Sequence, residues 1–350
     1  MNTVCVSTSK PYNVYIGSGI LSNLGNLLSA ASKASKVAIV SDSNVWPLYG
    51  EIVTAILKEH KYDVSSFVFP AGEESKNGST YLSLLEHLAK QNITRTDCII
   101  ALGGGVVGDL TGFAAATFLR GIDYVQIPTT VLSAVDSSVG GKTAIDLNAG
   151  KNLAGAFYQP IFVLCDTDTL ETLPKRIFLD GCAEIIKYGV LYDESLFMHL
   201  YEKGAEFDIA QTITRCVELK KDVVSTDEFD HGNRAFLNLG HTIGHAIEAK
   251  SHFGISHGQA VAAGMAIVAR SAVVHGFCSK ETSEKIVAAI SKFDLPVNTE
   301  YTASQLYAIA LSDKKRSKNH VQLIIPQCIG KCIGHTININ ELEEFISAGL

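Results

Sequence analysis

Residues 98–109 read Cys-Ile-Ile-Ala-Leu-Gly-Gly-Gly-Val-Val-Gly-Asp, and this stretch decides how the first half of the chain folds. Its first five residues form a short apolar run of the kind that becomes a buried strand, and the glycines follow at once. Residues 110–119 then have the apolar spacing of a helix. A strand that passes through glycines into a helix is typical of a parallel sheet covered by helices.

The alternation of short apolar runs and helical segments continues on both sides of this stretch. We predict strands at residues 36–41, 64–69, 98–102, 124–127 and 161–165, and helices at residues 80–91 and 110–119. After about residue 169 helical patterns take over, at residues 176–191, 208–225, 241–250 and 259–275, with one late strand at residues 321–326. The change of pattern predicts an α/β domain over residues 1–170 and a mainly α-helical domain over residues 171–350.

Length and composition indicate a globular protein of two domains. The chain has 350 residues, of which 47% are hydrophobic and 19% charged, and its net charge is -7. Lysine and arginine are scattered except in a cluster at residues 314–318, so we expect neither nucleic-acid nor membrane binding. The first residues lack the pattern of a secretory signal, and the eight cysteines fall singly. We therefore expect a cytoplasmic protein with reduced thiols.

The glycines after residue 102 are candidates for a phosphate-binding turn. Gly103, Gly105 and Gly108 match the pattern G-x-G-x-x-G, and without side chains the backbone N–H groups of the turn and of the following helix can approach a phosphate. The usual dinucleotide motif lies on the first strand of its domain, whereas this one lies on a later strand. A tight turn without a ligand therefore remains the alternative.

Two further segments of the first half carry side chains that suit a nucleotide. Asp42 ends the predicted strand at residues 36–41, where its carboxylate can accept hydrogen bonds from a ribose diol. Glu73 and Lys76, in the segment Pro-Ala-Gly-Glu-Glu-Ser-Lys at residues 70–76, are placed to hold an adenosine. A turn or helix cap is the alternative for Asp42, and a plain loop is the alternative for residues 70–76.

Residues 136–152 contain a Gly-Lys-Thr triplet at 141–143 that invites comparison with a Walker A loop. The glycine that such a loop requires five residues before Gly141 is Asp136, so the match fails. What remains is a glycine-rich turn that presents Lys142, followed by a short hairpin with Lys151 and Asn152. These side chains suit a cofactor phosphate or an acidic substrate, and a solvated hairpin is the alternative.

The helical half contains a candidate metal site. Asn238, His241 and His245 lie at spacings that place them along one side of a helix and its entry, and His257 precedes the next helix. Glu184 offers a carboxylate, and a catalytic zinc needs three nitrogen or oxygen ligands and an open position. The spacing of four residues favours His241 and His245 as a chelating pair. Histidines with purely structural roles remain the alternative.

Together these segments resemble the dehydroquinate synthase family of sugar-phosphate cyclases, and the resemblance covers nearly the whole chain. Its most specific parts are residues 101–113, 128–143, 183–189 and 237–248. The resemblance implies a Rossmann-like α/β domain that binds NAD, an α-helical domain that binds metal and substrate, and an active site in the cleft between them. It further implies a homodimer.

The resemblance also implies the site residues. Zn²⁺, with Co²⁺ as an alternative, would bind Glu184, His241 and His257, which leaves His245 to face the substrate. NAD would contact Asp42, Glu73, Lys76, Gly104, Gly105, Val106, Asp109, Thr129, Thr130, Leu132, Lys142, Lys151, Thr172 and Leu173. The substrate would contact Arg120, Asp136, Lys142, Asn152, Lys187, Lys220, Arg234, Asn238, His245 and Lys314.

The implied activity is a lyase reaction of the shikimate pathway, which leads to chorismate and the aromatic amino acids. A sugar-acid phosphate, 3-deoxy-D-arabino-heptulosonate 7-phosphate, becomes 3-dehydroquinate and phosphate. Transient oxidation of an alcohol by NAD is followed by phosphate elimination, reduction of the ketone, ring opening and aldol closure. Another sugar-phosphate cyclase and an NAD-dependent metal dehydrogenase of the glycerol or alcohol type are the alternatives. The chain departs from the family pattern at Ile177, Asp230 and Gln259.

Overall fold

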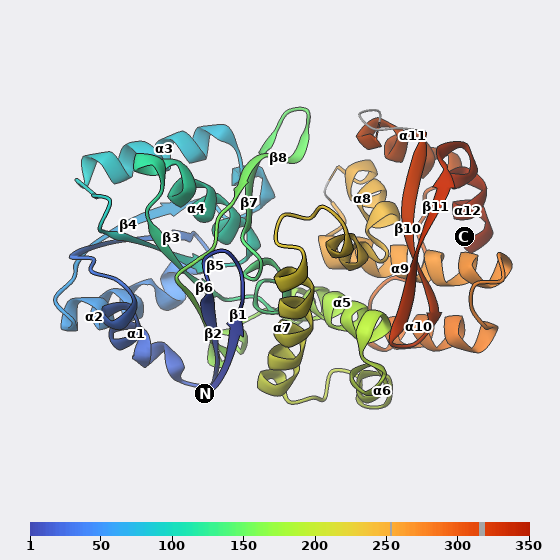
Figure 1. Ribbon diagram of the computed structural model, residues 1–350, viewed down its shortest axis with the longest axis horizontal. Coiled ribbons are helices and arrows are strands. Elements are labelled where there is room, and N and C mark those ends of the chain that lie inside the picture. The colour runs from blue at the N-terminus through green and yellow to red at the C-terminus, as the bar shows by residue number, and fades with distance from the viewer. Residues whose placement is uncertain (253, 315–318) are drawn as a thin grey trace. The chain divides into compact units, whose positions relative to one another are not determined.

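The computed structural model describes residues 1–252, 254–314 and 319–350, without the side chains of 312–314 (Figure 1). The chain forms two compact units. The first unit consists of Met1–Leu173 and Ile209–Phe229, and the second of Pro174–Asp208 and Asp230–Leu350. The division predicted from the sequence, 1–170 and 171–350, differs from these units mainly at residues 209–229, which lie with the first unit although they follow a segment of the second.

The first unit is built on a sheet of seven strands. These are β1 (Asn2–Val6), β2 (Tyr12–Gly17), β3 (Lys36–Asp42), β4 (Asp63–Phe69), β5 (Cys98–Gly103), β6 (Asp123–Pro128) and β9 (Phe162–Asp166), in the order β1-β2-β9-β6-β5-β3-β4. All neighbours are parallel except β1 and β2. The five predicted strands are confirmed, whereas β1 and β2 were not predicted.

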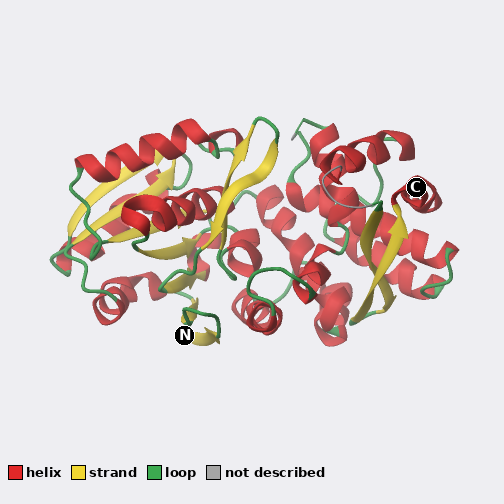
Figure 2. Ribbon diagram, turned by 45° about the horizontal axis from the view of Figure 1, so that its top comes forward, coloured by secondary structure: helices red, strands yellow, loops and turns green. Residues whose placement is uncertain are grey.

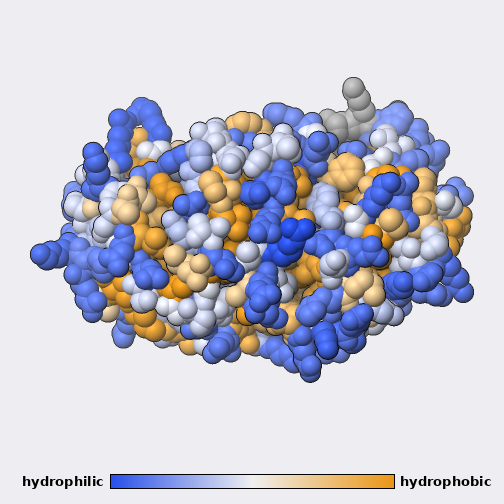
Figure 3. Space-filling view, turned by 60° about the horizontal axis from the view of Figure 1, so that its bottom comes forward, coloured by the Kyte–Doolittle hydropathy of each residue, from blue (hydrophilic) through white to orange (hydrophobic). Residues whose placement is uncertain are grey.

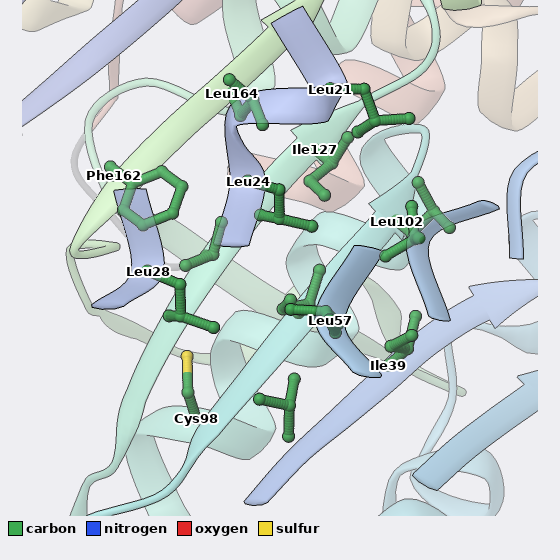
Figure 4. Close-up of a cluster of buried hydrophobic side chains, with 14 of the residues drawn as sticks. Leu21, Leu24, Leu28, Ile39, Leu57, Cys98, Leu102, Ile127, Phe162 and Leu164 are labelled. Atoms are coloured by element: carbon green, nitrogen blue, oxygen red, sulfur yellow. The ribbon is translucent and has the colours of Figure 1, made fainter. Parts of the chain in front are cut away.

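Helices cover both faces of this sheet (Figure 2). They are α1 (Leu24–Ala31), α2 (Glu51–Glu59), α3 (Gly78–Lys90) and α4 (Gly105–Thr117). Alternate residues of β5 point to opposite faces. Cys98, Ile100 and Leu102 join the core with α1 and α2, shown in Figure 4, and Ile99 and Ala101 join the core with α3 and α4. Burial on both faces explains why β5 is apolar throughout.

A helix from later in the chain completes the first unit. α7 (Ile209–Thr226) packs against β1, and Asn2 donates a side-chain hydrogen bond to Thr214 over 3.0 Å. Beyond the helix, the Glu228 carboxylate accepts hydrogen bonds from the backbone N–H and the hydroxyl of Ser9, over 2.7 and 2.8 Å. Helical periodicity fixes which residues form α7 but not which sheet edge it covers, so the sequence could not assign α7 to this unit.

The second unit is mainly helical, as the sequence predicted. Its helices are α5 (Lys175–Tyr192), α6 (Glu194–Lys203), α8 (His241–Lys250), α9 (His257–Val274), α10 (Lys280–Lys292), α11 (Ala303–Lys314) and α12 (Leu342–Gly349). The late strand is confirmed as β10 (His320–Cys328), which pairs with the unpredicted β11 (Lys331–Asn338). The mixed burial of β11 gives no clean alternation, which explains the omission.

The central helix of this unit is α9, which packs against α5, α8, α10 and α12. Its small residues let neighbouring backbones come close: a Cβ added at Gly264 would lie 2.1 Å from the carbonyl oxygen of Gly240, at the start of α8. The close packing of α8 and α9 holds His241 and His257, at the first positions of these helices, in a fixed relation.

Hydrophilic side chains occupy much of the face shown in Figure 3, with smaller hydrophobic areas between them. No helix in the described part of the chain combines the length and the apolar character that crossing a membrane requires.

A buried carboxylate ties three segments of the first unit together. Asp97, just before β5, is 1% exposed. Its Oδ1 accepts hydrogen bonds from the backbone N–H groups of Lys36 and Ser35, over 2.9 and 3.2 Å. Its Oδ2 accepts hydrogen bonds from the N–H and the hydroxyl of Thr94, over 2.8 and 2.7 Å. Burial alone would raise the pKa of Asp97, but these bonds hold it below its ordinary value of 3.8.

We expect Asp97→Ala to lower the free energy of unfolding at neutral pH by about 2–3 kcal/mol, because charge-assisted hydrogen bonds are lost and buried donors are left. Since the folded-state pKa is depressed, this contribution is present above the unfolded pKa and is lost as pH falls through the folded pKa. The measurement is urea unfolding at several pH values, which gives the free energy of unfolding of wild type and variant. The fluorescence of Trp46, the single tryptophan, reports on the first unit.

The control is Asp123→Asn, which removes an exposed ion pair with Lys10 and should cost about 0–1 kcal/mol. A difference between wild type and Asp97→Ala that stays constant as the pH falls below 3.8 would contradict the proposed role of the carboxylate.

Candidate functional site

The carboxyl ends of the parallel strands gather most of the candidate residues of the first unit at one edge of the sheet. The chain passes from β3 outward to β4 and then returns to β5 on the other side of β3, so the direction of winding reverses between β3 and β5. Open α/β sheets bind ligands outside the strand ends at such a reversal. Asp42 ends β3 and Gly104 follows β5, so the two residues flank this point.

The glycine turn after β5 leads directly into α4. Gly104 is the residue before the helix, and Gly105 is its first residue. A Cβ added at Gly104 would lie 3.2 Å from the Thr130 side chain, and one at Gly105 would lie 3.2 Å from the Ser137 hydroxyl. The first intrahelical bond runs from Gly108 N–H to Gly104 over 3.0 Å, so the preceding N–H groups point out of the helix end. This geometry suits a phosphate.

Asp42 takes part in a turn. Its Oδ1 accepts hydrogen bonds from the backbone N–H groups of Asn44 and Val45, over 2.8 and 3.0 Å. Asp42 therefore has the role in a turn that the sequence analysis left open as an alternative. These bonds use one carboxylate oxygen and hold the group at the end of β3, which is compatible with a second role for the other oxygen.

A network of charges surrounds Lys76, which is 4% exposed. Its Nζ lies 2.7 Å from Asp109 Oδ2, donates to Asn152 Oδ1 over 2.6 Å, and lies 3.5 Å from Glu73 Oε1. Lys151 Nζ lies 3.6 Å from the same oxygen of Glu73. Burial would lower the pKa of Lys76, but the carboxylates of Asp109 and Glu73 raise it above its ordinary value. The structure thus brings five predicted site residues into one cluster.

The hairpin of β7 (Lys142–Leu147) and β8 (Gly150–Phe157) joins this cluster through Asp146. The Asp146 N–H donates to the carbonyl oxygen of Lys76 over 2.8 Å, and Asp146 Oδ1 accepts from the N–H of Asn152 over 2.8 Å. The sequence reasoning missed Asp146. Its role depends on docking of the hairpin onto the loop after β4, and no spacing in the sequence signals that contact.

The remaining NAD candidates of this unit follow β6 and β9. Thr129 donates its N–H to the carbonyl oxygen of Gly103 over 3.0 Å, which joins the ends of β6 and β5. Thr130 shares a hydrogen bond of 2.8 Å with the Ser133 hydroxyl. The hydroxyls of Thr172 and Tyr49 lie 2.6 Å apart. Val106 and Leu132 lie in the segments after β5 and β6, and Leu173 lies beyond the end of β9.

A buried lysine from α7 reaches the segment after β6. Lys220 Nζ donates to the backbone carbonyl of Asp136 over 2.6 Å and to its Oδ1 over 2.8 Å. The ammonium group is buried, so this carboxylate provides its counter charge. Lys142, at the start of β7, is exposed. These three substrate candidates therefore occur in the first unit although Lys220 comes from the later half of the sequence.

Arg120 lies apart from these residues. It follows α4, which begins at the carboxyl edge of the sheet and runs back toward the opposite edge. Arg95, in the turn before β5, donates to the carbonyl oxygen of Leu119 over 3.1 Å, which fixes this segment at the amino edge. The structure does not bring Arg120 together with the other candidates of its unit, and its contact with substrate stays a prediction.

The second unit brings three ligand types together. Glu184 lies within α5, His241 begins α8 and His257 begins α9. Glu184 Oε1 lies 3.4 Å from Nε2 of His241 and 3.4 Å from Nε2 of His257. A tetrahedral zinc with ligands at about 2.0–2.1 Å requires ligand atoms about 3.3–3.4 Å apart. Both separations match one ion bound to the three side chains.

The electrostatics of Glu184 fit this reading. Both carboxylate oxygens are buried, with Lys187 in an ion pair with Oε2 and the imidazoles near Oε1, but without a hydrogen bond of normal geometry among the described residues. Burial would raise the pKa of Glu184, but Lys187 and His241 hold it well below its usual range. Glu184 is therefore an anion that still requires positive charge at Oε1.

Each imidazole has an acceptor for its second nitrogen. His241 Nδ1 lies 3.0 Å from the carbonyl oxygen of Leu239, and His257 Nδ1 lies 3.2 Å from Glu248 Oε2. An Nδ1–H donated to these acceptors leaves the Nε2 lone pair to a metal. Burial would lower the pKa of His257, but the carboxylates of Glu184 and Glu248 raise it to about 10. The position between Glu184 and His257 therefore attracts a cation, either a proton or a metal ion.

His245 lies outside the three-residue set. It is exposed, one turn after His241, and its ring centroid lies 5.4 Å from that of His241 and 6.1 Å from that of His257. The pair favoured by spacing alone, His241 with His245, therefore does not share a ligand group. The structure groups Glu184, His241 and His257, the set that the family resemblance implied, and forms a second possible group of His245, Glu248 and His257. Arg234 is buried and Asn238 exposed in the short helix before α8. The side chain of Lys314 lies outside the described residues.

Comparisons with known proteins cover almost the whole chain. Family models described as 3-dehydroquinate synthase N-terminal and 3-dehydroquinate synthase C-terminal match residues 66–180 and 181–316. A 3-dehydroquinate synthase of Pelobacter propionicus is 45% identical over 348 residues, which cover 97% of this chain and 96% of that protein. One of Clostridium acetobutylicum is 41% identical over 341 residues, covering 96% of each.

Solved structures give the same picture. A 2-deoxy-scyllo-inosose synthase complexed with carbaglucose-6-phosphate, NAD+ and Co2+ has a TM-score of 0.88 at 26% identity and covers 100% of both chains. A 2-epi-5-epi-valiolone synthase from Streptomyces hygroscopicus with NAD+ and Zn2+ bound has a TM-score of 0.88 at 26% identity, over 96% of this chain and 95% of that one. A glycerol dehydrogenase from Schizosaccharomyces pombe, with a TM-score of 0.64 at 20% identity over 99% of this chain and 91% of that one, shares the fold alone.

From the ligand geometry we expect His257→Ala to abolish stoichiometric zinc, because only two of the three ligands remain. His245→Ala is the matched control, since His245 belongs to the group with Glu248 and His257 but not to the group with Glu184. Metal content by atomic emission after dialysis measures both. Retention of zinc in His257→Ala together with its loss in His245→Ala would contradict the assignment.

Proposed function

Because the chain belongs to the 3-dehydroquinate synthase family, we propose that it converts 3-deoxy-D-arabino-heptulosonate 7-phosphate to 3-dehydroquinate and phosphate. The observation that carries this assignment is the 45% identity to a 3-dehydroquinate synthase over 97% of the chain. The reaction is a carbon–oxygen lyase step of the shikimate pathway. Its substrate is a small sugar-acid phosphate.

We assign NAD and a divalent metal, Zn²⁺ or Co²⁺, as cofactors. The support is the pair of site geometries together with the NAD and metal of the two cyclase neighbours. When bound, NAD accepts and returns a hydride, and the metal ion polarises a substrate oxygen as a Lewis acid. The residues that would hold the metal are Glu184, His241 and His257.

The carboxyl edge of the first unit would hold NAD. The N–H groups at the start of α4, which the glycines leave open, suit the pyrophosphate. Asp42, at the end of β3, suits the ribose, while Lys76 and Lys151 supply positive charge near the phosphates. The full set proposed for NAD is Asp42, Glu73, Lys76, Gly104, Gly105, Val106, Asp109, Thr129, Thr130, Leu132, Lys142, Lys151, Thr172 and Leu173.

A substrate with a carboxylate and a phosphate requires several cations, because each anion gives up water when it binds. We propose a set of residues that contact the substrate, and that His245 is one of them. The contacts proposed are Asp136, Lys142, Asn152, Lys187, Lys220, Arg234, Asn238, His245 and Lys314, whereas Arg120, at the amino edge of the sheet, stays a prediction from the family resemblance. The buried positions of Lys187, Lys220 and Arg234 support preorganised charge, which needs little rearrangement when the substrate arrives. We also propose a homodimer that acts in the cytoplasm.

Other sugar-phosphate cyclases are the nearest alternative. They share the fold and the kinds of cofactor, but the two cyclases described above are 26% identical to this chain, against 45% for the dehydroquinate synthase. Net dehydrogenases share the fold alone. A dehydrogenase of an unphosphorylated alcohol would also leave the buried cations without an anionic partner in the substrate.

For NAD binding we expect Asp42→Ala to weaken the affinity by about 1.5–3 kcal/mol, because a charge-assisted hydrogen bond to the ribose is lost. Asp42→Asn is the matched control for the turn, since an amide oxygen can still accept from Asn44 and Val45. Titration calorimetry with NAD measures both variants. Unchanged affinity in Asp42→Ala would show that the carboxylate serves the turn alone.

For the reaction itself we expect the purified protein to release phosphate from the heptulosonate phosphate with catalytic amounts of NAD. The hydride removed from the substrate returns to it, so no NADH should accumulate. Phosphate release and NADH absorbance, followed in the same sample, separate a lyase from a dehydrogenase. Release of NADH in proportion to substrate consumed would overturn the proposed function.

A further inference from the structure

Two buried carboxylates besides Glu184 act around the start of α9: Glu248 contacts the imidazole of His257, and Asp180 accepts hydrogen bonds from Ser256 and Gln259. The proposed reaction assigns a role to neither. We propose that Glu248 and Asp180 are positioning residues of the metal site: Glu248 orients the imidazole of His257, and Asp180 fixes the end of the helix that carries it. The inference rests on the metal binding in the proposed function. It concerns how this chain positions His257, the third metal ligand, and thereby sets the affinity of the site for zinc.

Glu248 acts from the helix that also supplies His241. The two residues are seven positions apart on α8, so they lie on the same side of the helix, two turns from each other. Glu248 is 4% exposed, and its Oε2 lies 3.2 Å from His257 Nδ1. A proton on Nδ1, donated to this carboxylate, leaves Nε2 as the ligand atom that faces Glu184. The negative charge also makes the imidazole a stronger donor to a metal.

Asp180 acts from the helix that supplies Glu184. The two residues are four positions apart on α5, one turn of the helix. Asp180 Oδ1 accepts hydrogen bonds from the Ser256 hydroxyl and, over 2.9 Å, from the N–H of Gln259. Ser256 is the residue before α9, so this carboxylate lies at the positive end of the helix that His257 begins. Asp180 therefore sets the distance between the helices of two ligands.

The contact between α5 and α9 also requires a glycine. A Cβ added at Gly258 would lie 1.9 Å from the carbonyl oxygen of Asp180, so a side chain there would push the two helices apart. Gln259 completes the helix start, since its Oε1 accepts the N–H of Ser256 over 3.4 Å. His257 thus occupies a backbone position fixed by α5 and an imidazole orientation fixed by α8.

The two carboxylates should have separable effects on metal binding. Removal of Glu248 frees the imidazole to rotate and lowers its basicity, which should weaken zinc binding about 10- to 100-fold. Glu248→Gln keeps an oxygen that can accept from Nδ1 but removes the charge, so its loss should be smaller than that of Glu248→Ala. Asp180→Ala should shift the start of α9 and change the geometry around the metal.

The test uses the full chain, stripped of metal with a chelator and titrated with zinc against a chromophoric chelator. Cobalt substitution adds a readout of geometry, because its visible absorption bands change with the ligand arrangement. We expect the order of zinc affinity to be wild type, Glu248→Gln, then Glu248→Ala. Asp180→Ala should show altered cobalt bands as well as weaker binding.

The matched control is Asp166→Asn in the first unit. Asp166 is also a buried carboxylate, and it accepts backbone hydrogen bonds from Gly19 and Leu21 over 3.0 and 2.7 Å within the first unit, whereas α5, α8 and α9 belong to the second unit. Its replacement should lower the thermal midpoint but leave zinc affinity unchanged. A loss of affinity in Asp166→Asn as large as in Glu248→Ala would reduce the effect to general destabilisation and overturn the inference.

The outcomes separate the inference from the function on which it rests. A wild-type chain that binds no zinc contradicts the proposed metal site itself. A wild-type chain that binds zinc while Glu248→Ala and Asp180→Ala bind it equally well contradicts only the positioning roles. If Glu248→Ala does not fold, Glu248→Gln decides: weaker zinc binding at an unchanged thermal midpoint supports the role of Glu248, and unchanged binding overturns it.

Discussion

Buried charge is the constraint that organises both units. Glu184, Lys187, Lys76 and Lys220 are each at most 5% exposed. An ionised group out of water is stable only when opposite charge and hydrogen bonds surround it. Lys76 faces Asp109 and Lys220 faces Asp136, whereas Glu184 faces Lys187 on one side and, on the other, two imidazoles with which it can share a cation.

The constraint explains why distant segments meet where they do. α7 lies with the first unit and delivers Lys220 to Asp136, and the β7–β8 hairpin docks beside Lys76. In the second unit, α5, α8 and α9 converge so that one carboxylate and two imidazoles share one position. Glycines at 258 and 264 permit this convergence because a side chain at either position would separate the backbones.

The same arrangement suits a reaction in which NAD takes a hydride from the substrate and later returns it. An enzyme of this kind must keep its cofactor, its metal and an anionic substrate in place through several steps, so positive charge has to be fixed before the substrate arrives. Buried lysines with fixed carboxylate partners meet that need better than surface lysines, whose side chains would have to be ordered at each turnover. Glu248 and Asp180 act in the same way on the metal site, because they hold His257 and the start of α9 in place before the metal binds.

The sequence by itself determined the class of fold and the chemistry. The apolar run at 98–102 with its glycines predicted a strand, a turn and a helix. The local patterns located five of the seven strands of the main sheet and six of the twelve α-helices in the described part of the chain, and they missed α1, α2, α6, α10, α11 and α12. These features are local, because propensity and periodicity act within about one turn or one strand. The motifs also identified the family, since long stretches with several matched residues leave little room for coincidence.

Only the tertiary structure decided which residues share a site. Spacing on α8 favoured His241 with His245, but the start of α9 brings His257 to Glu184, because helix packing and not sequence distance sets that contact. Sequence periodicity likewise could not predict the roles of α7, Asp146, Asp180 and Glu248. Their roles depend on contacts between helices, strands and loops that are distant in the sequence. Arg120 shows the converse: the family resemblance implies it as a substrate contact, yet the direction of α4 places it at the other edge of the sheet.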